Sequence, residues 1–401
     1  MIKIKKGYNL KIFILFLVQV FILSCTSYGE PSFYNIRKPL DFNSSGTPKG
    51  ENRYRSALDV IGVPEEATTN WGEDITRRKF LVATSSALIG LCFLNIECSD
   101  GNQGFVENSL KLFAQIKDRN PGSQNHTLAA EFIKAALAQM GYSEKEPKKA
   151  LISRNIEGIG TTYIAANLPL ENKNNPKNLI LCAHFDSIRQ GADDNASGVV
   201  ALLELARIFS SYNPYSHNIY FVFTGDEEYN HSGVRTFLKD AVSRNVTPEN
   251  TTVINVDTIG QSHLTATNIK AEEKRPQIWL TPAKTVGVDN WWEEFAKGFN
   301  ADSPLDFHVD KEGEIITPGE EAGTSDAALF ALYGFKALTI SGVSQDLARR
   351  AGIINDAGDI TRNLDFGSIN KIIEWLGNSV ERIDDKDRHV LLSTARNFKA
   401  P

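Results

Sequence analysis

Residues 181–198, LCAHFDSIRQGADDNASG, place a histidine and three aspartates directly after an apolar segment. A charged group beside an apolar strand costs free energy unless another group pairs with it. A bound cation would supply that pairing for His184, Asp186 and Asp194. Zinc binds imidazole nitrogen and carboxylate oxygen, and a catalytic zinc site leaves one position open for water. The segment therefore predicts part of a metal site.

Two later apolar segments are also followed by acids. The segment NIYFVFTG precedes Asp226, Glu227 and Glu228, and the segment TTVINV precedes Asp257. In an open parallel sheet, ligands bind beyond the carboxyl ends of the strands, so these acids should meet the histidine at one rim. The predicted zinc ligands are His184, Asp194, Glu228 and Asp257.

The acids within these motifs have distinct predicted roles. Asp194, in the turn GADDNASG, suits a bridge, because two zinc ions about 3.5–4 Å apart can share one carboxylate and a water. Asp186 can accept a hydrogen bond from the ring nitrogen of His184 that faces away from the metal. Glu227 and Glu228 are adjacent, so their side chains diverge, and we assign Glu227 as the general base.

Each motif also has an ordinary structural interpretation when it is taken alone. A histidine at a strand end is commonly a satisfied core or surface residue, and the acids at 226–228 are typical of a solvated edge. Asp194 or Asn195 would cap a helix that begins near Ala196. The occurrence of all three motifs at successive strand ends favours the metal site.

The site requires strands whose carboxyl ends lie side by side. From about residue 104 the sequence alternates β-rich segments with amphipathic helical segments, such as the predicted helix 196–212 between the predicted strands 178–185 and 218–225. This alternation predicts parallel pairing with helices on both faces. We expect one domain, residues 104–398, with a three-layer α/β (αβα) fold around a mostly parallel sheet.

Composition and charge limit the class of partner. The 401 residues are 41% hydrophobic and carry a formal net charge of −6, so a nucleic-acid partner, which usually needs a basic face, is not expected. Among the four cysteines, Cys182 is predicted to be a buried thiol. The sequence leaves the oligomeric state open.

The N-terminal hundred residues carry two segments that resemble export signals. Residues 1–25 show the basic, apolar and small-residue order of a secretory signal, with Cys25 as the acylated cysteine of a lipoprotein or, alternatively, an uncleaved membrane anchor. Residues 76–98 are similar to a twin-arginine signal or an anchor, and residues 26–75 are predicted to be a linker. We therefore expect an exported protein, in the cell envelope or secreted, with membrane contact through the N-terminal anchor or lipid.

The motifs AHFDS, GADDNASGV, GDEE and INVDTIG, in this order and spacing, resemble the bacterial zinc aminopeptidases of metallopeptidase family twenty-eight, of the leucyl aminopeptidase and aminopeptidase Y type. The resemblance spans about residues 105–380 and includes NPGS in an early loop. It implies a central mixed sheet flanked by helices, as in zinc exopeptidases. It also implies hydrolysis of N-terminal residues from peptides at two Zn²⁺ ions, with the same four ligands and with Glu227 as the base. For this chain we expect one or two Zn²⁺ ions.

The chain departs from this family at a late histidine ligand. The family has a motif like HTPxDT followed by NLD, where this chain has IINDAGDITRNLD. Anchoring on Asp359 puts Asn355 in the place of the histidine. Because an amide oxygen is a poor zinc ligand beside imidazole, Asn355 is a doubtful fifth ligand. Asp356, equally doubtful, could serve instead if the loop shifts by one residue. His263 and His308 are two other histidines that could supply the missing ligand, although neither lies at the family's position.

These observations predict an exported, metal-dependent exopeptidase that acts on peptides. A metal-bound hydroxide would attack the scissile carbonyl, and Glu227 would carry the proton to the leaving amine. Two alternatives stay open. One is a single-zinc enzyme related to glutaminyl cyclases, although such enzymes also rely on the late histidine. The other is a non-catalytic scaffold, because the late histidine is replaced by Asn355. The retention of Glu227 weighs against the scaffold, which has no need of a base.

Overall fold

The computed structural model describes residues 102–169, 177–211, 217–261, 276–284, 305–309, 313–315, 324–342 and 359–384. The predicted signal segments, the linker and Cys25 lie outside these residues, and so do Asn355, Asp356 and His263. No described helix combines the length and the apolar composition that crossing a membrane requires. The domain boundaries and the export signals therefore stay predictions.

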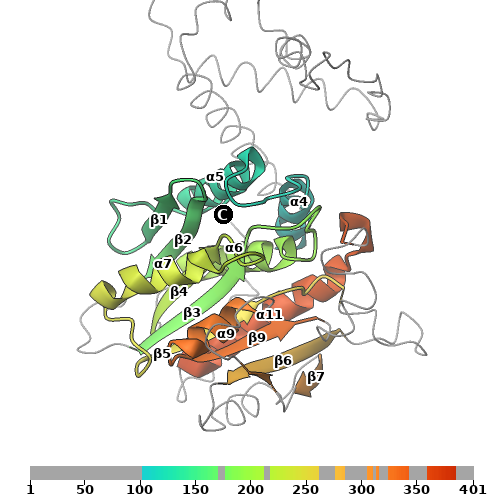
Figure 1. The fold of residues 1–401 in the computed structure, drawn as a ribbon. Helices are drawn as coiled ribbons and strands as arrows, with labels where there is room; N and C mark the ends of the chain where they lie inside the picture. The colour runs from blue at the N-terminus through green and yellow to red at the C-terminus, as the bar shows by residue number, and fades with distance from the viewer. Residues whose placement is uncertain are drawn as a thin grey trace, which may run out of the picture. The chain divides into compact units, whose positions relative to one another are not determined.

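The described strands form one nine-stranded sheet (Figure 1). The strands are β1 (Ala150–Ile156), β2 (Gly160–Leu168), β3 (Lys177–His184), β4 (His217–Thr224), β5 (Thr251–Val256), β6 (Gln277–Lys284), β7 (Asp306–Val309), β8 (Glu314–Ile315) and β9 (Lys336–Ser341). Their order is β1-β2-β4-β3-β5-β9-β6-β7, with β8 paired to β6. The central strands β4, β3, β5 and β9 are parallel to one another. The expectation of a mixed, mostly parallel sheet is confirmed.

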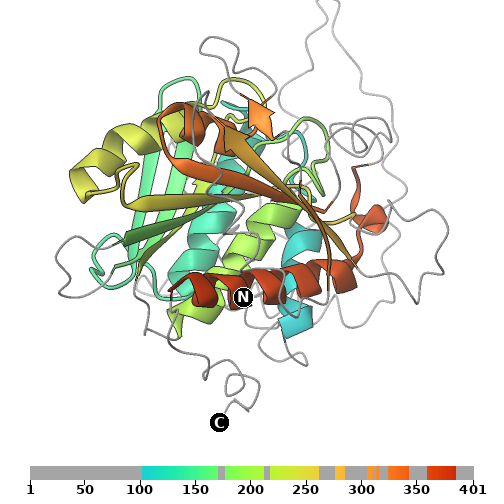
Figure 2. The same cartoon turned by 90° about the horizontal axis from the view of Figure 1, so that it is seen from below.

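Helices cover both faces of this sheet (Figure 2). The main helices are α4 (Asn102–Phe113), α5 (Gln124–Gln139), α6 (Ala196–Ser210), α7 (Ser232–Ala241), α9 (Asp326–Leu332) and α11 (Phe366–Asp384). Helices α4, α5, α6 and α11 pack on one side, whereas α7 and α9 pack on the other. This arrangement is the expected three-layer αβα fold.

Coverage on both faces explains why the central strands β3, β4, β5 and β9 are buried along nearly their whole length. All residues of β3 after its first are buried. On the side of α7 and α9, the ring of Phe237 lies 5.4 Å from Tyr163, 6.4 Å from Tyr220 and 6.1 Å from Phe330, measured between centroids. Cys182 is a buried free thiol, so its predicted role in packing is confirmed.

Strands β1 and β2 depart from the expected alternation of strands and helices. Strand β2 pairs antiparallel with both β1 and β4. Only residues 157–159 connect β1 to β2, and a parallel pair needs a much longer crossover. Helix α5 begins at Gln124, where the Ser123 hydroxyl accepts a hydrogen bond from the His126 main-chain N–H at 3.0 Å and caps the helix.

Strands β4, β3 and β5 end at a common rim. His184, the last residue of β3, pairs in register with Thr224, the last residue of β4. Strand β5 lies on the other side of β3 and runs in the same direction. The loops that follow these strands therefore begin side by side, as the motifs at their ends predict.

Candidate metal centre

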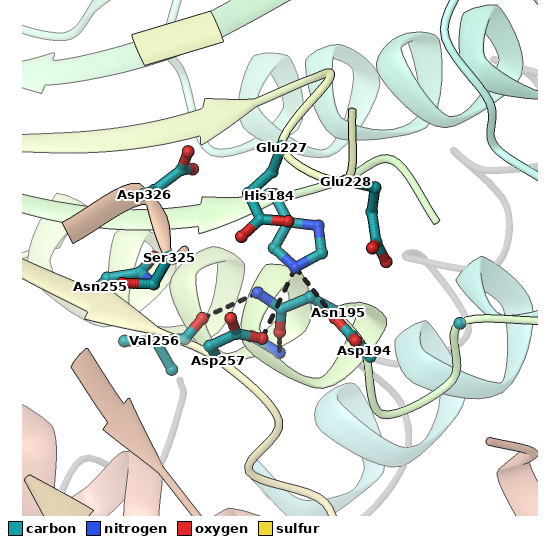
Figure 3. A network of polar contacts seen from close by, with 12 residues as sticks. His184, Asp194, Asn195, Glu227, Glu228, Asn255, Val256, Asp257, Ser325 and Asp326 are labelled. Atoms are coloured by element: carbon teal, nitrogen blue, oxygen red, sulfur yellow. Dashed lines mark hydrogen bonds and ion pairs between the residues drawn. The ribbon is translucent and has the colours of Figure 1, made fainter. Parts of the chain in front are cut away.

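The imidazole of His184 lies at the centre of the predicted site (Figure 3). Its Nε2 atom lies 3.0 Å from Oδ1 of Asp194 and 3.5 Å from Oδ1 of Asp257. All three side chains are buried. Residues that are 10 and 73 positions away from the histidine along the chain thus face the same ring nitrogen.

Two groups of three potential ligands share His184. The ligand atoms of His184, Asp194 and Glu228 lie within 4.8 Å of one another, and the same holds for His184, Glu227 and Asp257. The carboxylates of Glu227 and Glu228 lie on opposite sides of the ring (Figure 3). The structure therefore brings together the predicted ligands and the predicted base, whose separate roles stay predictions.

The turn that carries Asp194 is joined to the end of β5 by Asn195. The Asn195 Oδ1 atom accepts a hydrogen bond from the Gly198 main-chain N–H at 3.0 Å and caps helix α6. Its Nδ2 donates to the carbonyl oxygen of Val256 at 2.9 Å. Because Val256 directly precedes Asp257, one asparagine fixes two ligand-bearing segments. The helix-cap interpretation is confirmed for Asn195, and it is compatible with a metal site.

Asp186 faces the Nδ1 side of the His184 ring and also contacts a second loop. Nδ1 of His184 lies 3.2 Å from the main-chain oxygen of Asp186 and 3.6 Å from its carboxylate Oδ1. Its two carboxylate oxygens also accept hydrogen bonds from the main-chain N–H groups of Glu227 and Glu228, each at 3.1 Å. Asp186 thereby links the loop after β3 to the loop after β4.

The backbone next to two of these acids adopts an uncommon conformation. Asp226, directly before Glu227, has φ of 75°, and Thr258, directly after Asp257, has φ of 51°. Residues other than glycine rarely occupy this left-handed region. Such strain is retained mainly where the surrounding structure enforces it, and functional sites are enriched in it.

The concentration of carboxylates shifts the pKa values of the site. Burial opposes protonation of His184, but nearby carboxylates, led by Glu227 and Asp257, outweigh it and raise its pKa well above the usual range. Burial also raises the pKa of Glu227 and of Asp257, and neighbouring acids add to both shifts while His184 opposes them. A divalent cation would be the largest local charge and would favour the ionised carboxylates.

The chemistry of these side chains fits zinc. The Oδ1 atom of Asp257 is buried and makes no hydrogen bond, although it lies within ion-pair distance of His184. A buried carboxylate oxygen without a hydrogen bond is costly unless a charge compensates it. One imidazole with several carboxylates is a common donor set for catalytic zinc.

Asp359 places the late motif beside the Asp194 turn. Its Oδ1 accepts a hydrogen bond from the main-chain N–H of Asp193 at 2.5 Å, and its Oδ2 accepts one from Asp194 at 3.4 Å. Burial, with a contribution from Asp194, raises the pKa of Asp359 to about 8. The residue that anchors the motif is therefore at the site, while Asn355 and Asp356, the doubtful fifth ligands, lie outside the described residues.

His308 does not join either ligand group. It lies on β7, and its ring stacks on Trp279 with a centroid distance of 4.5 Å and an interplanar angle of 19°. Strand β7 is separated from β5 by two strands, β9 and β6. The structure therefore gives no support to His308 as a replacement for the late histidine.

Several buried polar residues behind the site were not identified from the sequence. Asp326, at the start of α9, accepts a hydrogen bond from the Thr224 hydroxyl and lies 3.1 Å from Nδ1 of His231 through its Oδ1. Its charge contributes to the raised pKa of Glu227. In the segment SDAALF, Ser325 precedes Asp326 as a helix cap and so marks the start of α9, whereas nothing in the local sequence marks His231 as the partner of Asp326.

A family model and curated proteins match part of this chain. The family model described as Peptidase family M28 matches residues 164–379. The BOS complex subunit NCLN of Rattus norvegicus is 32% identical over an alignment of 180 positions, which covers 39% of this chain and 30% of that protein. This chain therefore spans less than a third of that relative's length.

Solved structures share the fold at low sequence identity. The LapA aminopeptidase of Legionella pneumophila superposes with a TM-score of 0.55 at 15% identity, covering 74% of each chain. The glutaminyl cyclase of Porphyromonas gingivalis superposes with a TM-score of 0.50 at 15% identity, covering 70% of this chain and 98% of the other. At 15% sequence identity, this structural similarity establishes a shared fold only.

Proposed function

The chain belongs to peptidase family M28, and from that premise we propose that it is a zinc-dependent aminopeptidase that removes N-terminal residues from peptides. The observation that carries this proposal is the pair of ligand groups that share His184. Isolated acids at a protein surface are common, but buried carboxylates converging on one imidazole nitrogen are costly without a cation.

Four residues would hold the metal, with Asp194 facing the same histidine nitrogen as Asp257. The ligands in this proposal are His184, Asp194, Glu228 and Asp257. A bound zinc ion supplies Lewis acidity toward a peptide carbonyl oxygen and toward water. The acids around His184 also attract the protonated amine of a peptide's N-terminus, which favours an exopeptidase over an endopeptidase.

Glu227 acts as the proton carrier. Residue Glu227 is half-buried, and its main-chain N–H donates a hydrogen bond to the carboxylate of Asp186. In the proposed reaction Glu227 accepts a proton from the attacking water and delivers it to the nitrogen of the leaving peptide. A carboxylate in this role needs a neighbouring positive charge that keeps it ionised in the resting enzyme.

The test is hydrolysis by the purified full chain of a panel of aminoacyl p-nitroanilides, with and without zinc. We expect zinc-dependent release of p-nitroaniline, no release from N-acetylated substrates, and a loss of about 10²- to 10⁴-fold in Glu227→Gln. A parallel assay follows cyclisation of an N-terminal glutamine peptide. Cyclisation without hydrolysis would replace our proposal by a glutaminyl cyclase, and zinc binding without either reaction would replace it by a scaffold.

We also propose that the protein is exported and held at the membrane by lipid on Cys25. The support is the order of basic, apolar and small residues in 1–25. Metabolic labelling with a palmitate analogue should mark the wild-type chain and not Cys25→Ser. If neither the wild type nor Cys25→Ser is labelled and both are found in the membrane fraction, the N-terminal segment is an uncleaved membrane anchor.

A further inference from the structure

Segment 118–123, which leads into α5 and contains the NPGS motif, has no part in the proposed reaction. Two of its residues nevertheless contact the loops that follow β3 and β4. The first loop connects His184 to Asp194, and the second carries Glu228. The segment thus lies against both loops that complete one of the two ligand groups.

The guanidinium of Arg119 is fully buried and donates four hydrogen bonds to main-chain carbonyl oxygens. The distances are 2.6 Å from Nε to Phe185 O, 3.0 Å and 3.1 Å from Nη1 to Ile116 O and Gln190 O, and 2.9 Å from Nη2 to Gly191 O. Three of these acceptors belong to the loop 185–191. Only a planar group with several fixed donors can satisfy carbonyls in this arrangement.

The loop packs closely around this guanidinium. Gly191 has φ of +57°, and a Cβ atom there would lie 2.7 Å from Nη2 of Arg119 and 2.6 Å from the main-chain oxygen of Asp194. Both distances are shorter than real Cβ contacts. Position 191 therefore needs glycine, and Arg119 sets the path of the chain as it approaches Asp194.

Arg119 also contributes a positive charge close to the carboxylates of the site. Within the described ranges it is the only buried arginine or lysine. Burial lowers its pKa to about 10, while nearby carboxylates, led by Asp359 and Asp186, oppose the shift. The side chain is consequently cationic at neutral pH and reduces the mutual repulsion of the carboxylates around it.

Asn120, the next residue, reaches the second loop. Its Oδ1 accepts a hydrogen bond from the hydroxyl of Tyr229 at 2.6 Å. Tyr229 directly follows Glu228, and its side chain is 52% exposed. A single segment therefore fixes the loop of Asp194 through Arg119 and the loop of Glu228 through Asn120.

We propose that Arg119 and Asn120 are positioning residues that hold Asp194 and Glu228 at the separation a shared metal ion requires. The proposal rests on the proposed function, since it concerns the same site. Neither residue would touch substrate or metal, because both act through the loops that they contact.

The experiment compares the full chain with Arg119→Lys, Arg119→Met and Tyr229→Phe. Arg154→Lys is the matched control, because Arg154 is an exposed arginine on β1 that pairs with Asp240 of α7. Cobalt(II) binding is titrated by its visible absorption, whose shape reports coordination. Amide hydrogen exchange of the metal-free protein is followed in 185–195 and 226–231.

We expect Arg119→Lys to bind cobalt about 10- to 100-fold more weakly, with a changed spectrum and faster exchange confined to the two loops. Arg119→Met should bind cobalt still more weakly than Arg119→Lys, because methionine also lacks the positive charge. Tyr229→Phe loses one hydrogen bond and should bind about 2- to 10-fold more weakly. The control Arg154→Lys should match the wild type.

Unchanged cobalt affinity and spectrum in a folded Arg119→Lys protein would overturn the role of Arg119. Exchange accelerated equally across the whole domain would instead show a general structural role. Should the Arg119 variants fail to fold, wild-type affinity in Tyr229→Phe would still overturn the proposal for Asn120. Cobalt binding without peptide hydrolysis would refute the proposed function alone, and these comparisons of affinity and exchange would still be decisive.

Discussion

The Oδ1 atom of Asp186 accepts a hydrogen bond from the main-chain N–H of Glu227 at 3.1 Å. The other oxygen, Oδ2, accepts the N–H of the next residue at the same distance. One aspartate thus fixes the peptide units that carry both adjacent glutamates. The position of the proposed base depends on an acid from another strand end.

Replacing Asp186 by Asn tests this relationship. Asparagine keeps one acceptor oxygen and puts an NH₂ group against a main-chain N–H, so one of the two hydrogen bonds is lost. We expect kcat to fall about 10- to 100-fold with a smaller change in KM, because the base is displaced while substrate contacts remain. Steady-state kinetics on an aminoacyl p-nitroanilide gives both constants, and an unaltered kcat would show that Glu227 does not need this support.

Removal of metal should destabilise the protein as well as inactivate it. A ligand that binds only the native state adds about 2.7 kcal/mol to the free energy of unfolding at a concentration of 100 times its Kd. We expect dialysis against a chelator to lower the melting temperature and zinc to restore it. In Asp257→Asn, zinc should raise the melting temperature much less. An identical zinc effect in both proteins would place the binding site elsewhere.

Acid should destabilise the fold partly through His126, which is buried with neither ring nitrogen hydrogen-bonded and stacks on Phe185 at 4.8 Å. Burial lowers its pKa, although the charge of Asp186 opposes the shift. The unfolded chain gains a proton below about pH 6.5, where folded His126 stays neutral. The free energy of unfolding should therefore decrease as the pH falls from 7 toward 5, by at most about 1.4 kcal/mol per unit from this residue.

Urea titrations at pH 7 and pH 5 measure that loss. Substitution of His126 by Leu or by Phe removes the titrating group, so the difference in unfolding free energy between the two pH values should shrink in both variants. Their stability at pH 7 can change in either direction, because the space beside Gly225 is tight. A wild-type pH dependence in both variants would rule out His126 as the source.

The core between the sheet and α7 should be energetically separate from the site. Phe237 packs against three aromatic rings there, and Phe237→Ala should lower the free energy of unfolding by about 3–5 kcal/mol. Zinc affinity of the folded fraction should stay at the wild-type value. Urea unfolding and a zinc titration check the two parts, and a large loss of affinity would show that α7 helps to position the ligands.

Much of this architecture was predictable from local patterns. The apolar segments that became β3, β4 and β5 and the helix between the first two were expected within one or two residues of their observed ends. The acids at those strand ends were expected to meet because parallel strands present their carboxyl ends at one rim. The hairpin β1–β2 was not anticipated, since the order of pairing depends on the length of the connection.

The sequence by itself determined which residues have donor atoms and which strand ends carry them, because side-chain chemistry and hydrophobic periodicity are local properties. Only the tertiary structure decided that the Asp186 carboxylate binds two main-chain amides, that Arg119 fastens the loop before Asp194, and that Asp359 lies against the same turn. These contacts join residues far apart in the chain through hydrogen bonds to the main chain. A main-chain amide or carbonyl is present at every residue, so no pattern of side chains reveals which one is bound.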